Sequence, residues 1–99
     1  MSEANITRGI INYLRSVPHI LVLKLHGGRY QTAGLPDLLV VKEGRAYFLE
    51  VKAPGKKPTK LQRATMDLIA RSGAVVKIVS SVEDVKEVIG KHQASQQGR

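Results

Sequence analysis

The feature that most constrains this chain is the dipeptide Glu43-Gly44, which stands between two apolar runs and predicts a β-hairpin. Glycine supplies the positive φ that a tight turn requires. If the loop has two residues, Lys42 pairs with Arg45, and counting outward places Asp37 opposite Glu50. Directly opposed residues point to the same face, with Cβ atoms about 4.5–5.5 Å apart. A longer loop would shift the register by one and remove this direct opposition.

The predicted hairpin brings two carboxylates together at one end. They repel each other, and the pKa of one should rise unless a cation lies between them. A divalent metal ion would serve, and ligation by oxygen alone suits Mg²⁺ or Mn²⁺. Lys52 shares the face of Glu50, because it stands two residues further along the strand. The alternative is a solvated salt bridge among Asp37, Glu50 and Lys52, and spacing alone does not separate the two interpretations.

Charge is the strongest compositional signal. The 99 residues include 16 Lys and Arg against 8 Asp and Glu, a net charge of +8 at pH 7. This excess favours a polyanionic partner, most often nucleic acid, although a basic surface without a partner would have the same composition. The absence of cysteine excludes disulfides and thiolate zinc sites. No apolar run approaches the roughly 20 residues of a membrane span, and no signal peptide is evident, so we expect a cytoplasmic protein without a membrane partner.

The expected element order is α-β-β-β-α-β-α, in the α/β class, with a mixed sheet and helices against its faces. The elements are a helix over 2–16, a strand over 20–25, the two hairpin strands, a helix over 59–72, a strand over 74–79 and a helix from 81. The continuously apolar run 38–41 should lie at the centre of the sheet, covered on both faces. We expect one domain over residues 1–92 and a disordered tail over 93–99.

The most basic segment follows the hairpin directly, in a loop rich in proline and glycine. Its cations are Lys52, Lys56, Lys57, Lys60 and Arg63. A run of lysines is usually only a solvated face, but its position beside the carboxylates favours contact with phosphates. A second, glycine-rich loop contains Arg29. It could approach a nucleic-acid backbone closely or serve as a plain connection.

Two further polar residues each have a purely structural explanation. Glu3 stands one helical turn before Ile6 and so points along the apolar face of the first helix, but an acidic residue in a first turn also complements the helix dipole. Gln62 stands three residues after Thr59, which fits a capping box. In that motif Gln62 would reach back to the backbone N–H of Thr59.

These residues together resemble a known family. Pro36-Asp37, a gap and then Glu50-Val51-Lys52 resembles the signature of the PD-(D/E)xK nucleases, and the element order resembles the restriction-endonuclease-like α-β-β-β-α-β core, here with a further C-terminal helix. The fuller pattern comprises Glu3, Gly34-Leu-Pro-Asp37-Leu, Phe48-Leu-Glu50-Val-Lys52, Thr59-Lys-Leu-Gln62 and Gly73-Ala-Val-Val. It resembles a stand-alone VRR-NUC domain over nearly the whole chain.

The resemblance implies a role for each core residue. Asp37 and Glu50 would ligate Mg²⁺ or Mn²⁺, with the backbone carbonyl of Val51 as a further ligand. Lys52 would orient or activate the attacking water and stabilise charge on the phosphate. Glu3 would support the metal, directly or through a water.

The resemblance also implies a position for Gln62 and an activity. Gln62 would lie at the edge of the site, on the helix that follows. The expected activity is hydrolysis of phosphodiester bonds by a metal-dependent DNA endonuclease. Phosphates would be contacted by Arg29, Lys56, Lys57, Lys60 and Arg63.

Backbone contacts without base-reading elements imply selectivity for DNA structure rather than sequence. The resemblance to small phage and bacterial nucleases implies branched DNA, such as a four-way junction, as the substrate. A homodimer would present two cutting sites to two strands, in a bacterial or phage-infected host cell. Two alternatives stand beside this prediction. One is a nucleic-acid-binding module without catalysis, which the net charge would support equally well. The other is a nuclease directed to RNA.

Overall fold

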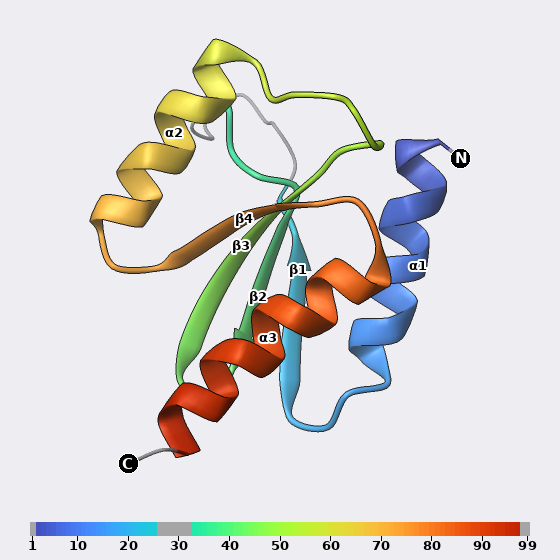
Figure 1. Ribbon diagram of the computed structural model, residues 1–99, viewed down its shortest axis with the longest axis vertical. Coiled ribbons are helices and arrows are strands. Elements are labelled where there is room, and N and C mark those ends of the chain that lie inside the picture. The colour runs from blue at the N-terminus through green and yellow to red at the C-terminus, as the bar shows by residue number, and fades with distance from the viewer. Residues whose placement is uncertain (1, 26–32, 98–99) are drawn as a thin grey trace.

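The computed structural model describes residues 2–25 and 33–97, the last seven of them by their backbone alone. The elements are α1 (Glu3–Arg15), β1 (Ile20–Lys24), β2 (Leu38–Lys42), β3 (Arg45–Val51), α2 (Lys60–Arg71), β4 (Val75–Val79) and α3 (Val82–Gln97). This is the predicted order (Figure 1). None of the described helices is long and apolar enough to cross a membrane.

The last helix, α3, is described as far as Gln97. The expected division into one domain over residues 1–92 and a disordered tail over 93–99 stays a prediction.

The four strands form one mixed sheet in the order β1-β2-β3-β4. β2 is antiparallel to both neighbours, and β4 joins β3 in parallel through the crossover that contains α2. The predicted hairpin register is confirmed, since Lys42 pairs with Arg45 and Leu38 with Leu49. One further step in this register places Asp37 across from Glu50.

The hairpin turn explains this register. Glu43 has a φ of 53° and Gly44 a φ of 76°, and positive values at both central positions are typical of a type I′ turn. The twist of that turn matches the twist of the two strands, which favours a two-residue loop. A non-glycine residue in this conformation costs about 1–2 kcal/mol. The turn therefore holds the register in spite of a less favourable residue at its first position.

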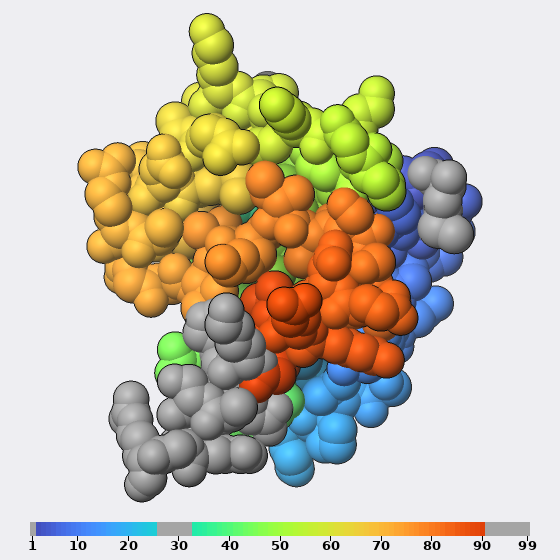
Figure 2. Space-filling model, in the orientation of Figure 1, coloured from blue at the N-terminus to red at the C-terminus, as the bar shows by residue number. Residues whose placement is uncertain are grey.

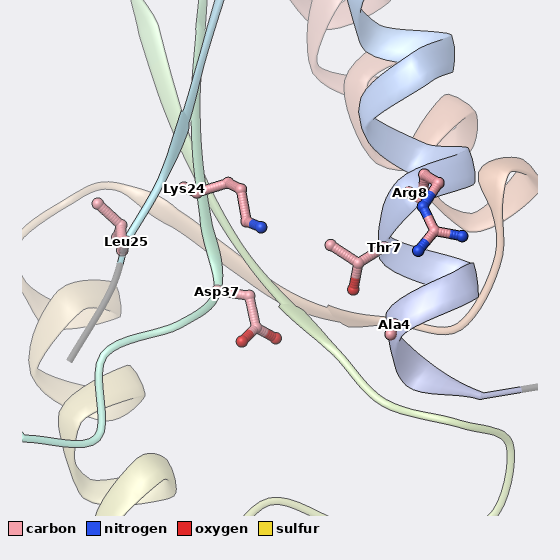
Figure 3. A pocket seen from close by; sticks show the side chains of 6 residues that line it. All are labelled: Ala4, Thr7, Arg8, Lys24, Leu25 and Asp37. Atoms are coloured by element: carbon pink, nitrogen blue, oxygen red, sulfur yellow. The ribbon is translucent and has the colours of Figure 1, made fainter.

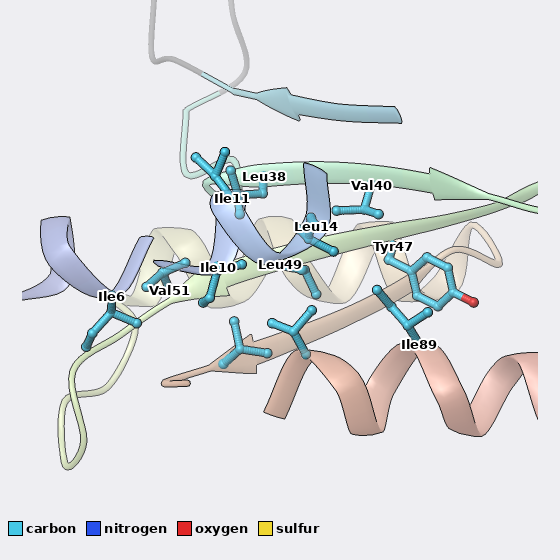
Figure 4. Close-up of a cluster of buried hydrophobic side chains, with 12 residues drawn as sticks. Ile6, Ile10, Ile11, Leu14, Leu38, Val40, Tyr47, Leu49, Val51 and Ile89 are labelled. Carbon is cyan, nitrogen blue, oxygen red and sulfur yellow. The ribbon is translucent and has the colours of Figure 1, made fainter. Parts of the chain in front are cut away.

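One face of the sheet carries α1 and α3, and the main core lies between them and the strands (Figure 4). The core residues are Ile6, Ile10, Ile11, Leu14, Leu38, Val40, Tyr47, Leu49, Val51, Val79, Val85 and Ile89. The helical spacing of Ile6, Ile10 and Leu14 is the stripe that the sequence predicted for the first helix.

The opposite face carries α2, which buries Thr65 and Met66. β2 lies in the interior of the sheet as predicted, but the prediction that both of its faces are covered is only half right. Leu38 and Val40 are buried against α1 and α3, whereas Leu39 and Val41 on the α2 side remain partly exposed. The reason is that α2 packs closest to β4 rather than over the centre of the sheet.

Candidate active site

The candidate site lies at the end of the hairpin remote from its turn, where β2 begins and β3 ends. Asp37 immediately precedes β2, and its Oδ2 accepts a hydrogen bond of 2.8 Å from the backbone N–H of Val51. This bond holds the carboxylate against the last residue of β3. The structure thereby brings Asp37, Glu50 and Lys52 together at one strand end.

Glu50 is the unusual member of this group, because it is a carboxylate with only 2% of its surface exposed. Its Oε2 accepts a hydrogen bond of 3.0 Å from Nε2 of Gln62 and lies 3.4 Å from Nζ of Lys52. Its Oε1 is buried and has no hydrogen-bond partner among the described residues. An unsatisfied buried carboxylate oxygen is costly, and a bound cation would offset that cost.

The electrostatics of Glu50 agree with this geometry. Burial raises the pKa of the Glu50 carboxyl above its usual range, and the charge of Asp37 raises that pKa further. Lys52 opposes both effects without cancelling them, and Glu3 adds a smaller upward contribution to the pKa. The carboxylate repulsion that the hairpin register predicted is therefore present in the folded protein.

Glu3 reaches the site from the first turn of α1. Its Oε2 accepts a hydrogen bond of 3.3 Å from the backbone N–H of Ala53, just beyond the end of β3. Even so, the described part of the chain contains no group of three or more His, Cys, Asp or Glu side chains arranged to hold a metal ion. Direct ligation would therefore fall to Asp37 and Glu50, and the position of Glu3 agrees better with a role through water.

The residues present fit a magnesium or manganese ion. Mg²⁺ in phosphate-transferring sites is commonly bound by one or two carboxylates, while waters and substrate phosphate complete the ligand set. Asp37 and Glu50 supply two carboxylates, and Oε1 of Glu50 is the oxygen for which the protein provides no other partner. The assignment of the Val51 carbonyl as a further ligand stays a prediction.

Gln62 combines the two roles that the sequence left open. Its Oε1 accepts from the N–H of Thr59 at 2.9 Å, and the Thr59 hydroxyl accepts from the N–H of Gln62 at 3.1 Å, which completes the capping box of α2. Its Nε2 remains available and donates to Glu50. The side-chain amide of Gln62 thus caps the N-terminus of α2 through its oxygen and holds the buried Glu50 carboxylate through its nitrogen.

The fold and the site can now be compared with known proteins. A family model of the VRR-NUC domain matches residues 12–83 of the chain. The chain belongs to the VRR-NUC domain family. This is a family of nuclease domains. The matched segment contains Asp37, Glu50, Lys52 and Gln62, whereas Glu3 precedes it.

Two solved structures support the same assignment. One, a VRR-NUC domain, has 29% sequence identity and a TM-score of 0.74, over 89% of this chain and 94% of the other. Another, a VRR-NUC domain protein, has 18% identity and a TM-score of 0.73, over 91% and 86% of the two chains. They confirm the restriction-endonuclease-like fold. No curated protein sequence matches this chain significantly.

The predicted phosphate-contacting residues of this VRR-NUC domain follow the site in the chain. Lys56, Lys57, Lys60 and Arg63 are all exposed, in the loop after β3 and the start of α2. This segment forms the upper edge of the molecule in the space-filling view (Figure 2). Within residues 2–25 and 33–90, none of the four makes a salt bridge. Arg29, which we also predicted to contact phosphate, lies outside the described residues.

Sequence reasoning missed three polar residues beside the site. Thr7 and Arg8 of α1 and Lys24 of β1 line a pocket together with Asp37 (Figure 3). Thr7 stands four residues after Glu3, so the helical period was a usable signal for its position. Arg8, five residues after Glu3, lies off that face and had no such signal. Lys24 had no such signal, because its position depends on how β1 pairs with β2.

A glycine fixes the distance between Asp37 and α2. Gly34 has a φ of 79°, and a Cβ atom there would lie 2.8 Å from the carbonyl oxygen of Leu61 and 3.0 Å from Oγ1 of Thr65. Oγ1 of Thr65 donates a hydrogen bond of 2.9 Å to the carbonyl of Ala33. The segment before Asp37 therefore packs directly on the helix that carries Gln62.

We predict that Gly34→Ala separates this segment from α2 and lowers both the melting temperature and the nuclease activity. The matched control is Gly44→Ala, because Gly44 has a similar φ of 76° and nothing within 4 Å of its Cβ position. Both variants incur the cost of positive φ, about 1–2 kcal/mol. Only Gly34→Ala adds the steric contact, so equal losses in the two variants would contradict this explanation.

We predict that Glu50→Gln stabilises the metal-free protein at neutral pH by about 1–3 kcal/mol. The folded-state pKa of Glu50 is raised, so its contribution to stability is complete below the unfolded pKa and is lost as pH rises through the folded pKa. The advantage of the variant should therefore disappear at acidic pH. Thermal unfolding with and without Mg²⁺ measures this, since added Mg²⁺ should stabilise only wild type. Glu87→Gln, an exposed substitution on α3, is the control and should behave as wild type.

Proposed function

We propose that this VRR-NUC domain is a metal-dependent endonuclease that hydrolyses phosphodiester bonds in DNA. The observation that carries the proposal is the buried Oε1 of Glu50, which has no hydrogen-bond partner among the described residues and lies near the Asp37 carboxylate and the Lys52 ammonium. A protein that only bound nucleic acid would gain nothing from a buried carboxylate next to a second carboxylate. The alternative of a binding module is therefore less favoured than the net charge alone suggested.

Each residue has a role that follows from its contacts. Asp37 and Glu50 would hold Mg²⁺ or Mn²⁺, which when bound polarises a phosphate and lowers the pKa of a water. Gln62 fixes Oε2 of Glu50 and so leaves Oε1 available to a metal ion. Lys52 lies at the same strand end, where its charge would stabilise the phosphate and orient the attacking water. Glu3 would position a water near Ala53 rather than bind the ion itself.

The proposed substrate is branched DNA, such as a four-way junction. Exposed lysines in the loop after β3 supply charge for the phosphate backbone, and such contacts carry no sequence information. Recognition would then depend on the shape of the DNA. This activity would operate in the cytoplasm of a bacterial or phage-infected cell.

We expect Asp37→Ala to reduce cleavage by on the order of a hundredfold or more, because it removes one of two carboxylates from the proposed metal site. Duplex DNA, a four-way junction and RNA would each be incubated with Mg²⁺ or Mn²⁺. Asp67→Ala, which removes an exposed carboxylate on α2, is the control for the change in charge. The enzyme proposal fails if wild type binds these substrates without cutting them, or if Asp37→Ala cuts as well as wild type. Faster cutting of RNA than of DNA would favour the RNA alternative.

The proposed active form is a homodimer. Large apolar side chains remain exposed on the sheet face that carries α2, in particular Leu21 and Leu23 of β1. Leu61 and Leu68 of α2 are also exposed. Leu61 and Leu68 stand four residues before and three residues after Thr65 in α2, and Thr65 hydrogen-bonds to the segment before β2. A two-fold contact through these residues would bury apolar area and pair two cutting sites.

We expect Leu23→Ser combined with Leu68→Ser to convert the dimer into a monomer. Light scattering should then report a mass near 10.8 kDa instead of twice that value. The fold should persist because both side chains are exposed in the monomer. Asn12→Ser, at an exposed position of α1 on the other face of the sheet, is the control. A wild-type protein that is monomeric and fully active would exclude the dimer.

A further inference from the structure

A pocket opens directly beside the candidate metal site. It has a volume of about 370 Å³ and is lined by Ala4, Thr7, Arg8, Lys24, Leu25 and Asp37. It lies between the N-terminal half of α1 and the adjoining ends of β1 and β2 (Figure 3). Asp37 belongs to both the pocket and the metal site, so a group in the pocket would be a direct neighbour of a metal-bound phosphate.

The walls of this pocket are cationic. Lys24 extends from β1 towards α1, and Arg8 approaches from the helix (Figure 3). Nη1 of Arg8 donates a hydrogen bond of 2.9 Å to Oδ1 of Asn5, which leaves the other guanidinium donors available. Within residues 2–25 and 33–90, neither cation forms a salt bridge with Asp37 or with any other carboxylate. Two cations thus line this pocket, and neither is paired with a carboxylate of the described residues.

The one hydroxyl in the pocket does not compete for an anion. Oγ1 of Thr7 donates to the backbone carbonyl of Glu3 at 2.8 Å, so its hydrogen is already committed. Ala4 and Leu25 contribute only apolar surface. Recognition of a ligand would therefore depend on the guanidinium and the ammonium, a pair of groups that suits a phosphate.

We propose that Arg8 and Lys24 bind the phosphate adjacent to the scissile phosphate in the DNA strand that is cut. The inference rests on the proposed nuclease function, and it extends the phosphate contacts to the opposite side of Asp37. In Figure 3 the loop after β3 runs on one side of Asp37, and Lys24 and Arg8 lie on the other. A strand held at both sides would present the bond between them to Asp37 and Glu50, which is how bound neighbours position a reacting group.

The test removes one phosphate charge at a time. A DNA substrate that wild type cleaves at a single site is prepared with one neutral methylphosphonate, placed in turn at each position around that site. Wild type should lose about tenfold in kcat/KM at one position adjacent to the scissile bond, because a charge-assisted contact is removed there. Arg8→Ala and Lys24→Ala should show the same loss with the unmodified substrate and little further loss with the modified one.

Two matched controls separate this contact from a general loss of positive charge. Arg15→Ala removes an exposed arginine further along α1, and Lys77→Ala removes an exposed lysine from β4, the opposite edge strand. Neither residue lines the pocket, so both variants should keep the wild-type response to each methylphosphonate. Arg8→Lys should restore part of the response, because it keeps the charge and loses the planar fork.

The outcomes separate this inference from the proposed function. If Arg8→Ala and Lys24→Ala respond to every methylphosphonate as wild type does, the inference is wrong while cleavage by wild type still supports the nuclease. If wild type cuts nothing, the nuclease proposal fails. The phosphate contact of Arg8 and Lys24 is then tested by the affinity for DNA in the absence of metal, measured at several salt concentrations. A salt-dependence slope lower by about 1 in each pocket variant than in its control supports the phosphate site, and equal slopes reject it. A response confined to strands with a 5′-terminal phosphate would overturn the assignment to an internal phosphate.

Discussion

The buried carboxylate of Glu50 imposes the constraint on which the site depends. A charge at 2% exposure is expensive unless its oxygens have partners. The protein supplies partners for Oε2 from Gln62 and Lys52 but supplies none within its described residues for Oε1. A cation bound at Oε1, as proposed, would supply the partner that this oxygen lacks.

The parts of the fold that surround Glu50 serve to hold this arrangement. The type I′ turn sets the register that brings Asp37 across from Glu50, and the N–H of Val51 fixes the Asp37 carboxylate. Gly34 permits the segment before Asp37 to touch α2, whose capping residue Gln62 reaches back to Glu50. The hairpin and α2 are thus coupled through the same carboxylate, although they are separate in the chain.

Positive charge surrounds this acidic centre on two sides. The loop after β3 contributes exposed lysines, and the pocket between α1 and β1 contributes Arg8 and Lys24. A negatively charged polymer could therefore cross the site, with its reacting phosphate at the carboxylates and the neighbouring phosphates at the cations. The exposed leucines on the α2 side of the sheet are the surface through which the proposed dimer would form.

The sequence by itself determined the local elements and the central pair of carboxylates. A two-residue turn fixes the pairing register of the two strands, so Asp37 and Glu50 could be placed opposite each other without a structure. Capping residues likewise marked where α1 and α2 begin. Only the tertiary structure placed Lys24 and Arg8 beside Asp37, because the long connection between β1 and β2 leaves their register open, and helix docking depends on packing. The burial of Glu50 was also beyond the sequence, since exposure is a property of the neighbours that a fold assembles.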